Sequence, residues 1–388
     1  MTLQAENVTA ALRAVLGDAS TALHEPTLGG REWDYVKDCL DSGWVSSVGQ
    51  YVDKLEDMLS EYTGAHHATV TVNGTTALQV VLRLAGVRAG DEVIVPALTF
   101  VGTANAVAHI GAVPHFADAA TETLGIDPAK LDRHLDEIAS SVGGTVINKQ
   151  TGRRIAAVVC VHIFGHAVDL DALTAVCEKH ALPLVEDAAE SLGSYYKGRH
   201  TGNHGLISVL SFNGNKTVTT GGGGAILTND DTLAKSARHL TTTAKAPHRW
   251  EYFHDEVGYN YRMPNINAAL GCAQLEQLPG FIERKRALAG LYRDAFADVD
   301  GLRFFVEPAF AKSNYWLNAI LLDPATAALR DEVLAHTNDN GFMTRPAWTP
   351  LHKLPMYAAC PRMDLTVAED LAGRIINIPS SSSLPRPA

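Results

Sequence analysis

The sequence predicts an α/β protein with a large domain, whose mostly parallel sheet of about seven strands is flanked by helices, and a smaller α+β C-terminal domain. The length of 388 residues exceeds the roughly 250 to 300 residues at which a single core usually stops growing. Between residues 67 and 230, short β-branched runs alternate with helical stretches, which is the pattern of parallel strands joined by helices. After residue 250 this alternation ends, and a long helical stretch precedes one short strand.

The expected domain boundaries follow these changes of pattern. Leu12, Val15 and Leu16 recur at helical spacing, which predicts an N-terminal helical extension over residues 1–22. The large domain is expected over 23–255 and the small domain over 256–388. The expected strands of the large domain are HATVTV, DEVIVP and VPHFAD, with further buried-looking runs over 155–161, 182–186, 206–212 and 225–228. The small domain should contain a helix over 265–296 and a strand over 318–322, and only the tail after Pro379 is expected to be disordered.

Composition excludes several classes of protein. The 43 acidic and 32 basic residues leave a formal net charge of −11, and no lysine or arginine cluster gathers the opposite sign, so nucleic acid is not an expected partner. The longest apolar runs fall short of the ~18 residues of a membrane span, and the first residues lack a secretory signal. We therefore expect a cytoplasmic, soluble protein. The five cysteines are scattered without a C-x-x-C pair and predict core thiols rather than disulfides or a zinc site.

The spacing and position of the glycines argue against a dinucleotide-binding site. The only dense run, Gly221 to Gly224, lacks the G-x-G-x-x-G spacing and precedes a strand, whereas a dinucleotide fingerprint follows a strand and opens a helix. We expect these glycines to allow a tight bend of the backbone.

The segment VTVNGTTALQVVL indicates an anion site. A strand runs into Asn73, Gly74, Thr75 and Thr76 and then into a helix. Free backbone N–H groups at a helix N-terminus, the helix dipole and threonine hydroxyls all favour a phosphate group. The simpler alternative is that Thr75 or Thr76 only caps the helix.

Two further strand ends carry an acid and a lysine. One strand ends in Glu186-Asp187, and Lys216 follows another strand in a loop rich in Gly, Asn and Thr. Ligands of open parallel sheets bind outside the carboxyl ends of the strands, so the acid, the lysine and the phosphate cup should lie together. Pyridoxal 5'-phosphate (PLP) requires these three features: a lysine for its aldehyde, a carboxylate for its ring nitrogen and donors for its phosphate.

At this point the sequence resembles the nucleotide-sugar aminotransferases of the DegT/StrS family, which have PLP fold type I. The resemblance covers residues 23–379. Four strings look most like the branch that aminates UDP- or GDP-linked 4-keto-6-deoxy-N-acetylglucosamine on the legionaminic acid route. They are LHEPTLGGREWDYVKDCLDSGWVSSVGQYV, SFNGNKTVTTGGGG, RPAWTPLHKLPMY and INIPSS.

The resemblance implies a role for each matching position. Lys216 would hold the aldehyde as a Schiff base and move protons, and Asp187 would pair with the ring nitrogen. The other residues implied to bind the cofactor are Gly74, Thr75 and Ser211 at the phosphate, Phe100 stacked on the ring, Glu190 near the ring hydroxyl, and Asn260, reaching the phosphate of a neighbouring subunit. Phe100 could instead be a core aromatic, and Asn260 a turn residue.

Physical chemistry adds an expectation for two of these groups. A carboxylate near a protonated ring nitrogen should have a lowered pKa, which applies to Asp187. Lys216 must be neutral to attack a carbonyl, and burial favours the neutral form.

Other candidates are weaker. Arg262, Arg345 and His352 lie in segments that relatives fold toward the substrate, and a pyrophosphate would need such donors, although they are equally compatible with surface positions. His162 and His166 are four residues apart but have no evident third ligand, so no metal site is expected.

The function expected from this resemblance is transfer of an amino group, from L-glutamate as the expected donor, through pyridoxamine phosphate to C4 of a nucleotide-linked 4-keto-6-deoxy sugar. A homodimer with shared active sites is implied because Asn260 would act in trans. The alternatives are a perosamine-type enzyme acting on GDP-4-keto-6-deoxymannose and a non-catalytic PLP-fold regulator. A sugar 3-dehydratase of the same fold would have histidine in place of Lys216.

Overall fold

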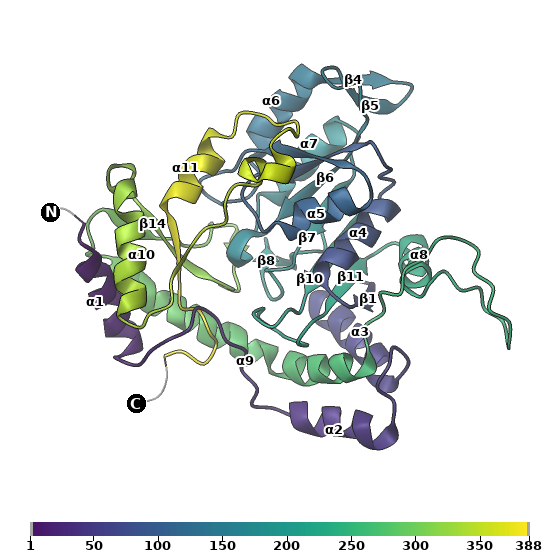
Figure 1. The fold of residues 1–388 in the computed structure, drawn as a ribbon, viewed down its shortest axis with the longest axis horizontal. Helices are drawn as coiled ribbons and strands as arrows, with labels where there is room; N and C mark the ends of the chain where they lie inside the picture. Colours follow the sequence, from purple (N-terminus) through teal and green to yellow (C-terminus); the bar gives the residue numbers. More distant parts are fainter. Residues whose placement is uncertain (1–2, 386–388) are drawn as a thin grey trace.

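The computed structural model describes residues 3–385, and its centre is a seven-stranded sheet (Figure 1). In spatial order the strands are β1 (His67–Thr71), β11 (Gly224–Thr228), β10 (Ile207–Ser211), β7 (Leu184–Asp187), β6 (Ile155–Val161), β2 (Glu92–Pro96) and β3 (Val113–Ala117). Five neighbouring strands, from β10 to β3, run parallel, and β11 pairs antiparallel with both β1 and β10. The predicted fold class is confirmed.

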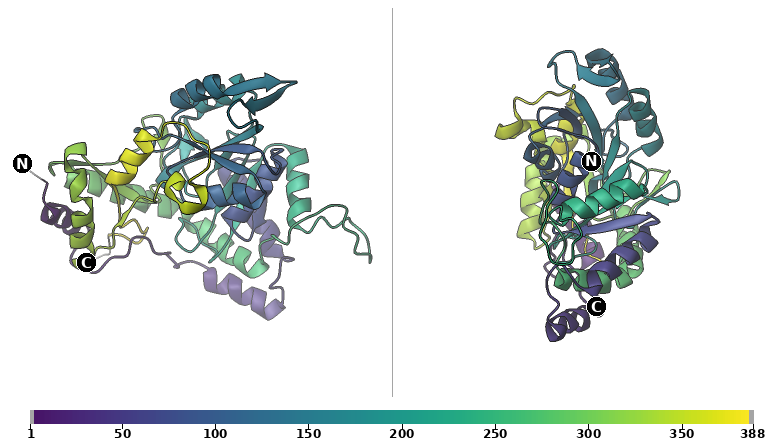
Figure 2. Two further views of the ribbon diagram at one scale, coloured as in Figure 1. Left: turned by 45° about the horizontal axis from the view of Figure 1, so that its top comes forward. Right: turned by 90° about the vertical axis from the view of Figure 1, so that its right-hand side faces the viewer.

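Helices cover both faces of this sheet (Figures 1 and 2). They are α3 (Gln50–Thr63), α4 (Gly74–Leu84), α5 (Gly102–His109), α6 (Pro128–Ile138), α7 (Leu170–Lys179) and α8 (Asp231–Thr241). Helix α2 (Glu32–Ser42) packs on α9 (Asn265–Phe296). Successive residues of one strand enter different cores: Val209 packs with α4 and α5, and Leu210 packs with α3. Because both faces are covered, the strands are continuous apolar runs rather than alternating ones.

The structure also contains several short strands and 3-10 helices. β4 (Ala139–Val142) and β5 (Thr145–Asn148) form a hairpin, and β8 (Tyr195–Tyr196), β9 (Arg199–His200) and β13 (Ala311–Lys312) form a three-stranded sheet. Short 3-10 helices are η1 (Ile163–Gly165), η2 (Pro324–Leu329), η3 (Leu351–Lys353) and η4 (Pro355–Tyr357).

A second sheet lies beside the C-terminal half of α9 (Asn265–Phe296), the long helix that runs along both parts of the molecule (Figure 1). Its four antiparallel strands are β12 (Leu302–Phe304), β14 (Asn318–Leu322), β16 (Ile375–Ile378) and β15 (Arg345–Pro346). Helices α10 (Arg330–Asp339) and α11 (Thr366–Arg374) pack against it, and α1 (Ala5–Leu16) contacts α9 and α10. The expected helix over 265–296 and strand over 318–322 are confirmed.

The expectation of a disordered tail is wrong for residues 380–385; residues 386–388 lie outside the described part. Ser380 and Ser381 are buried. The hydroxyl of Ser380 accepts from the Asn318 amide at 2.7 Å, and that of Ser381 accepts from the Glu25 amide at 2.8 Å. The serines therefore satisfy backbone donors of two other segments, a role that composition does not reveal.

Two further expectations can be compared with the structure. All five cysteines are free, and all but Cys360 are buried, so the predicted core thiols are confirmed. Among residues 3–385, no helix is long and apolar enough to cross a membrane.

Candidate active site

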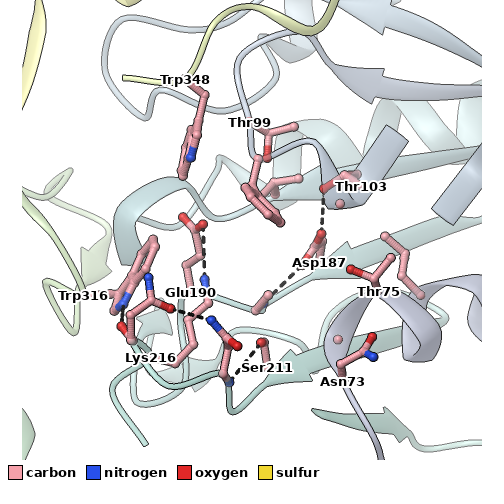
Figure 3. A pocket seen from close by; sticks show the side chains of 18 residues that line it. Asn73, Thr75, Thr99, Thr103, Asp187, Glu190, Ser211, Lys216, Trp316 and Trp348 are labelled. Carbon is pink, nitrogen blue, oxygen red and sulfur yellow. Dashed lines mark hydrogen bonds and ion pairs between the residues drawn. The ribbon is translucent and has the colours of Figure 1, made fainter. Parts of the chain in front are cut away.

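A cavity of about 310 Å³ opens at the carboxyl ends of β7 and β10, where α4 and α5 begin (Figure 3). It lies within the range of roughly 300 to 1,000 Å³ typical of small-molecule sites. The residues that line it are Asn73, Gly74, Thr75, Leu78, Thr99, Phe100, Gly102, Thr103, Val161, Asp187, Ala189, Glu190, Ser211, Asn213, Asn215, Lys216, Trp316 and Trp348. Seven of the eight residues predicted to bind the cofactor are among them; Asn260 is the exception.

The N-terminus of α4 forms one end of the cavity. Asn73 is the cap of this helix, because its side-chain oxygen accepts from the Thr76 amide at 2.8 Å. The alternative that Thr75 or Thr76 is the capping residue is therefore wrong. A Cβ on Gly74 would lie 3.0 Å from the Cβ of Ser211, so the first turn of α4 and the end of β10 face each other closely. This end offers the helix dipole and two hydroxyls to an anion.

Asp187, the last residue of β7, points into the middle of the cavity (Figure 3). One carboxylate oxygen accepts from the Thr103 hydroxyl at 2.9 Å, and the other accepts from the Ala189 amide at 3.2 Å. Burial raises the pKa of this carboxyl, against the opposing effect of these hydrogen bonds and of Lys216. The expected fall of the pKa depends on a cationic ring nitrogen, so it stays a prediction for the cofactor-bound protein.

Lys216 and Glu190 form the other end of the cavity. The Lys216 amine lies 3.5 Å from Oε1 of Glu190, and Oε2 of Glu190 accepts from the Phe164 amide at 2.8 Å. Burial lowers the pKa of Lys216, with Glu190 and Asp187 opposing the change. Burial also raises the pKa of Glu190 to about 7. The direction for Lys216 agrees with the expectation that burial favours its neutral form.

Thr103, Trp316 and Trp348 line the cavity but are absent from the sequence-based set. The Trp316 ring lies against Lys216, with its centroid 3.7 Å from the amine, and Trp348 packs on Phe164 with ring centroids 5.1 Å apart. Both tryptophans come from segments a hundred or more residues after Lys216 and outside any strand-end motif. Trp348 lies within a quoted family string, RPAWTPLHKLPMY, which was the one available signal.

Four other predicted residues do not line this cavity. Asn260 is exposed and pairs with Thr242 at the base of the segment after α8. Arg262 is buried in an ion pair with Glu56. The Arg345 guanidinium donates to the side-chain oxygen of Asn338 at 3.0 Å, and His352 bonds to Glu369 at 2.9 Å. Their predicted contacts with substrate or with a second subunit stay predictions.

The two histidines considered for a metal site, His162 and His166, contact a carboxylate and aromatic rings, respectively. His162 hydrogen-bonds to Glu186 at 3.1 Å. His166 is buried between the rings of Phe305 and Tyr315, and burial lowers its pKa to about 4. Neither histidine belongs to a cluster of potential metal ligands within the described residues.

The donor set of the cavity fits PLP. Figure 3 shows Asp187 between Glu190 on one side and Thr75 on the other, with Ser211 below it. A lysine, a buried carboxylate and a helix N-terminus with hydroxyls match the aldehyde, the ring nitrogen and the phosphate of one small aromatic molecule.

Comparison with known proteins identifies the family. The sequence model of the DegT/DnrJ/EryC1/StrS aminotransferase family matches residues 26–387. GDP-perosamine synthase of Escherichia coli O157:H7 is 39% identical, covering 93% of each chain. The putative pyridoxal phosphate-dependent aminotransferase EpsN of Bacillus subtilis is 36% identical over 93% of this chain and 91% of its own. The structure of DesI with its TDP-sugar product has a TM-score of 0.82, with 30% identity over 94% of this chain and 89% of that one. The predicted class of PLP-dependent aminotransferase is confirmed, and the chain belongs to the DegT/DnrJ/EryC1/StrS aminotransferase family.

Proposed function

We propose that this enzyme transfers an amino group to C4 of a GDP-linked 4-keto-6-deoxy hexose, with 4-keto-6-deoxymannose as the sugar. The sequence most resembles the branch that acts on 4-keto-6-deoxy-N-acetylglucosamine, and GDP-4-keto-6-deoxymannose is the alternative substrate. The relative from E. coli O157:H7 is named for GDP-perosamine and matches over nearly the whole chain, which supports the alternative better. The amino donor in this proposal is L-glutamate.

One observation carries the proposal: Lys216, Asp187 and the N-terminus of α4 line a single cavity. When bound there, PLP supplies a carbonyl that carries the amino group from donor to acceptor and a ring that withdraws electrons. Gly74, Thr75 and Ser211 would hold its phosphate, and Asp187 would keep its ring nitrogen protonated. Phe100, half exposed at the rim, would cover one face of the ring.

Lys216 would carry the proton transfers. A lysine with a lowered pKa is available in its neutral form to accept a proton at Nζ, and burial lowers the pKa of Lys216. Glu190, whose pKa of about 7 lies close to physiological pH, can hold or release a proton 3.5 Å from that amine. Lys216 also distinguishes this proposal from a sugar 3-dehydratase, which would have histidine at this position.

The proposal includes a homodimer in which Asn260 completes the partner's phosphate site. The segment after α8 extends away from the body of the protein (Figures 1 and 2) and exposes three aromatic side chains, Trp250, Tyr252 and Phe253. Exposed apolar groups gathered in this way are typical of protein interfaces. Asn260 lies at the base of this segment and outside its own chain's cavity, as a residue acting in trans would.

A substrate panel tests the proposal. The purified enzyme, loaded with PLP and supplied with L-glutamate, is incubated with GDP-4-keto-6-deoxymannose, with UDP- and GDP-linked 4-keto-6-deoxy-N-acetylglucosamine and with TDP-4-keto-6-deoxyglucose. NMR then locates the new amine and its stereochemistry. We expect C4 amination with the highest kcat/KM for GDP-4-keto-6-deoxymannose.

The outcomes separate the candidate functions. Preference for an N-acetylglucosamine nucleotide would instead favour the substrate of the legionaminic acid branch. Deoxygenation at C3 would indicate the dehydratase. No turnover by a protein that binds PLP would favour the non-catalytic regulator. The Lys216→Arg variant is the control, because it keeps the positive charge and removes the primary amine.

A further inference from the structure

The Lys216 amine lies between two groups that attract a cation. Its Nζ is 3.7 Å from the centroid of the Trp316 ring and 3.5 Å from Oε1 of Glu190. A cation over an indole face is stabilised by the ring's negative quadrupole, most strongly where water is excluded. Both neighbours are nearly inaccessible to solvent, with exposed fractions of 3% for Trp316 and 4% for Glu190.

Trp316 is held in this position by hydrogen bonds from its indole N–H, its backbone amide and its backbone carbonyl. Its indole N–H donates to the carbonyl of Asn215, the residue before the lysine, at 2.6 Å. Its backbone amide donates to Asn314 at 2.8 Å, and its carbonyl accepts from Lys285 at 3.2 Å. Because both the indole and the backbone of Trp316 are held, the side chain loses no further rotamer freedom when its ring contacts the lysine.

Asn314 joins the two sides of this arrangement. Its side-chain amide donates to the carbonyls of Glu190 and Leu192, each at 2.9 Å, while its oxygen accepts from the Trp316 amide at 2.8 Å. The backbones of Glu190 and Trp316, whose side chains flank Lys216, are therefore linked by one buried residue, although they lie 126 positions apart in the sequence.

Burial lowers the pKa of Lys216, and the charges of Glu190 and Asp187 oppose this change. These two carboxyl groups therefore attract the ammonium form that burial disfavours. The third ionisable neighbour, His24, has a pKa lowered by burial and by the charges of Lys285 and Lys216, so it stays neutral. The Trp316 face adds an attraction that acts on the protonated amine alone.

We propose that the face of Trp316 and the carboxylate of Glu190 form a holding site for the Lys216 ammonium while the lysine is not bonded to the cofactor. Trp316 is then a positioning residue: it keeps a flexible side chain in the cavity and favours its protonated form. The proposal rests on the assignment of Lys216 as the cofactor lysine. The proposed site involves no covalent step, because the Lys216 ammonium only keeps its proton there.

The test titrates Lys216 in the cofactor-free protein. Lysine is labelled with ¹³C at Cε, and the Lys216 signal is assigned as the one missing from Lys216→Met. We expect Trp316→Leu to lower the pKa of this lysine by about one unit, the tenfold change in proton affinity that a buried cation–π contact implies. Trp316→Phe should retain part of the effect, and Glu190→Gln should lower the pKa as well.

A second readout is the proton chemical shift of Lys216 in the wild-type protein and in the same variants. The amine of Lys216 lies over the indole face, so the ring current should move the signals of the neighbouring Cε protons upfield of those of exposed lysines. This displacement should disappear in Trp316→Leu and persist in Trp316→Phe. The matched control is Trp348→Leu, which removes the cavity's other tryptophan, the one that packs on Phe164, and should leave both readouts unchanged.

The proposal is overturned if the pKa of Lys216 in folded Trp316→Leu is unchanged or raised, or if the wild-type signals lack the upfield displacement. If Trp316→Leu does not fold, Trp316→Phe and the wild-type ring-current measurement decide. Attachment of the cofactor is measured separately by borohydride labelling. If the holding site is wrong, the titration and ring-current results change but the label is still found on Lys216. If the assignment of Lys216 is wrong, the label is found on another lysine.

Discussion

Gly224 in β11 passes so close to Gly74 at the start of α4 that a Cβ on Gly224 would lie 2.7 Å from the Gly74 nitrogen. The same Cβ would lie 2.7 Å from the carbonyl carbon of Asn73, the helix cap. This contact brings the antiparallel strand against the turn that forms the phosphate end of the cavity. The glycine run therefore includes a close backbone approach, in addition to the expected bend at Gly221, where φ is +77°.

The first prediction follows from this contact. Gly224→Ala should destabilise the protein by roughly 2 kcal/mol, because the new methyl group meets backbone atoms that cannot turn away. It should also weaken PLP binding by displacing the α4 N-terminus. Urea unfolding and PLP titration measure the two effects. Gly222→Ala is the control, since its Cβ would meet only the Val72 oxygen at 3.9 Å. Equal stability of the two variants would contradict this explanation.

Asp187 gives a prediction about catalysis. Asp187→Ala should lower kcat by about 10²- to 10³-fold in both half-reactions, as other electrostatic deletions in active sites do, because the ring nitrogen loses its anionic partner. Single-turnover absorbance measurements with each substrate test this. Thr103→Val, which removes only the hydrogen bond to Asp187, should have a much smaller effect. Wild-type rates in Asp187→Ala would reject the assignment.

Glu186 gives a prediction about stability and pH. Its carboxylate accepts from the amides of Gly202, His204 and Gly205 and from His162. Burial alone would raise its pKa, but His162, first through its hydrogen bond, and the backbone donor of Gly205 lower it from 4.5 to about 2. A depressed pKa contributes stability above the unfolded-state value, and this contribution is lost as pH falls toward the folded-state value.

Glu186→Gln should therefore lower the free energy of unfolding at pH 7 by an amount on the order of 3 kcal/mol. The difference from wild type should shrink between pH 4.5 and 2. Urea unfolding at several pH values measures it, with Glu178→Gln on the exposed side of α7 as the control. A difference that stays constant with pH would show that the charge of Glu186 is not the cause.

The proposed dimer predicts complementation between two inactive variants. Lys216→Ala and Asn260→Ala should each be nearly inactive, and mixed subunits should regain activity, because one site of the heterodimer inherits neither lesion. At best half of the sites are restored. If heterodimers form and stay inactive, Asn260 acts within its own chain, and the proposal that two subunits share an active site is wrong.

The sequence predicted the parts of the site that follow strand ends. Asp187 and Lys216 could be placed because parallel strands bring their carboxyl ends to one edge. Ser211, Glu190 and Phe100 came from the family resemblance. Trp316 and Thr103 escaped prediction because their positions depend on packing between distant segments: Trp316 is fixed by Asn314, Asn215 and Lys285. The order of the tail likewise depends on partners more than 60 residues away.

The central claim is that Lys216 carries the cofactor, and reduction with borohydride tests it most directly. The PLP-loaded protein is reduced, digested and mapped by mass spectrometry, with Lys216→Arg as the control. We expect one pyridoxyl adduct, on the peptide that contains Lys216, and none in the variant. An adduct on Lys285, a fully buried lysine whose pKa burial lowers to about 7, or on any other lysine would contradict the assignment of the active site.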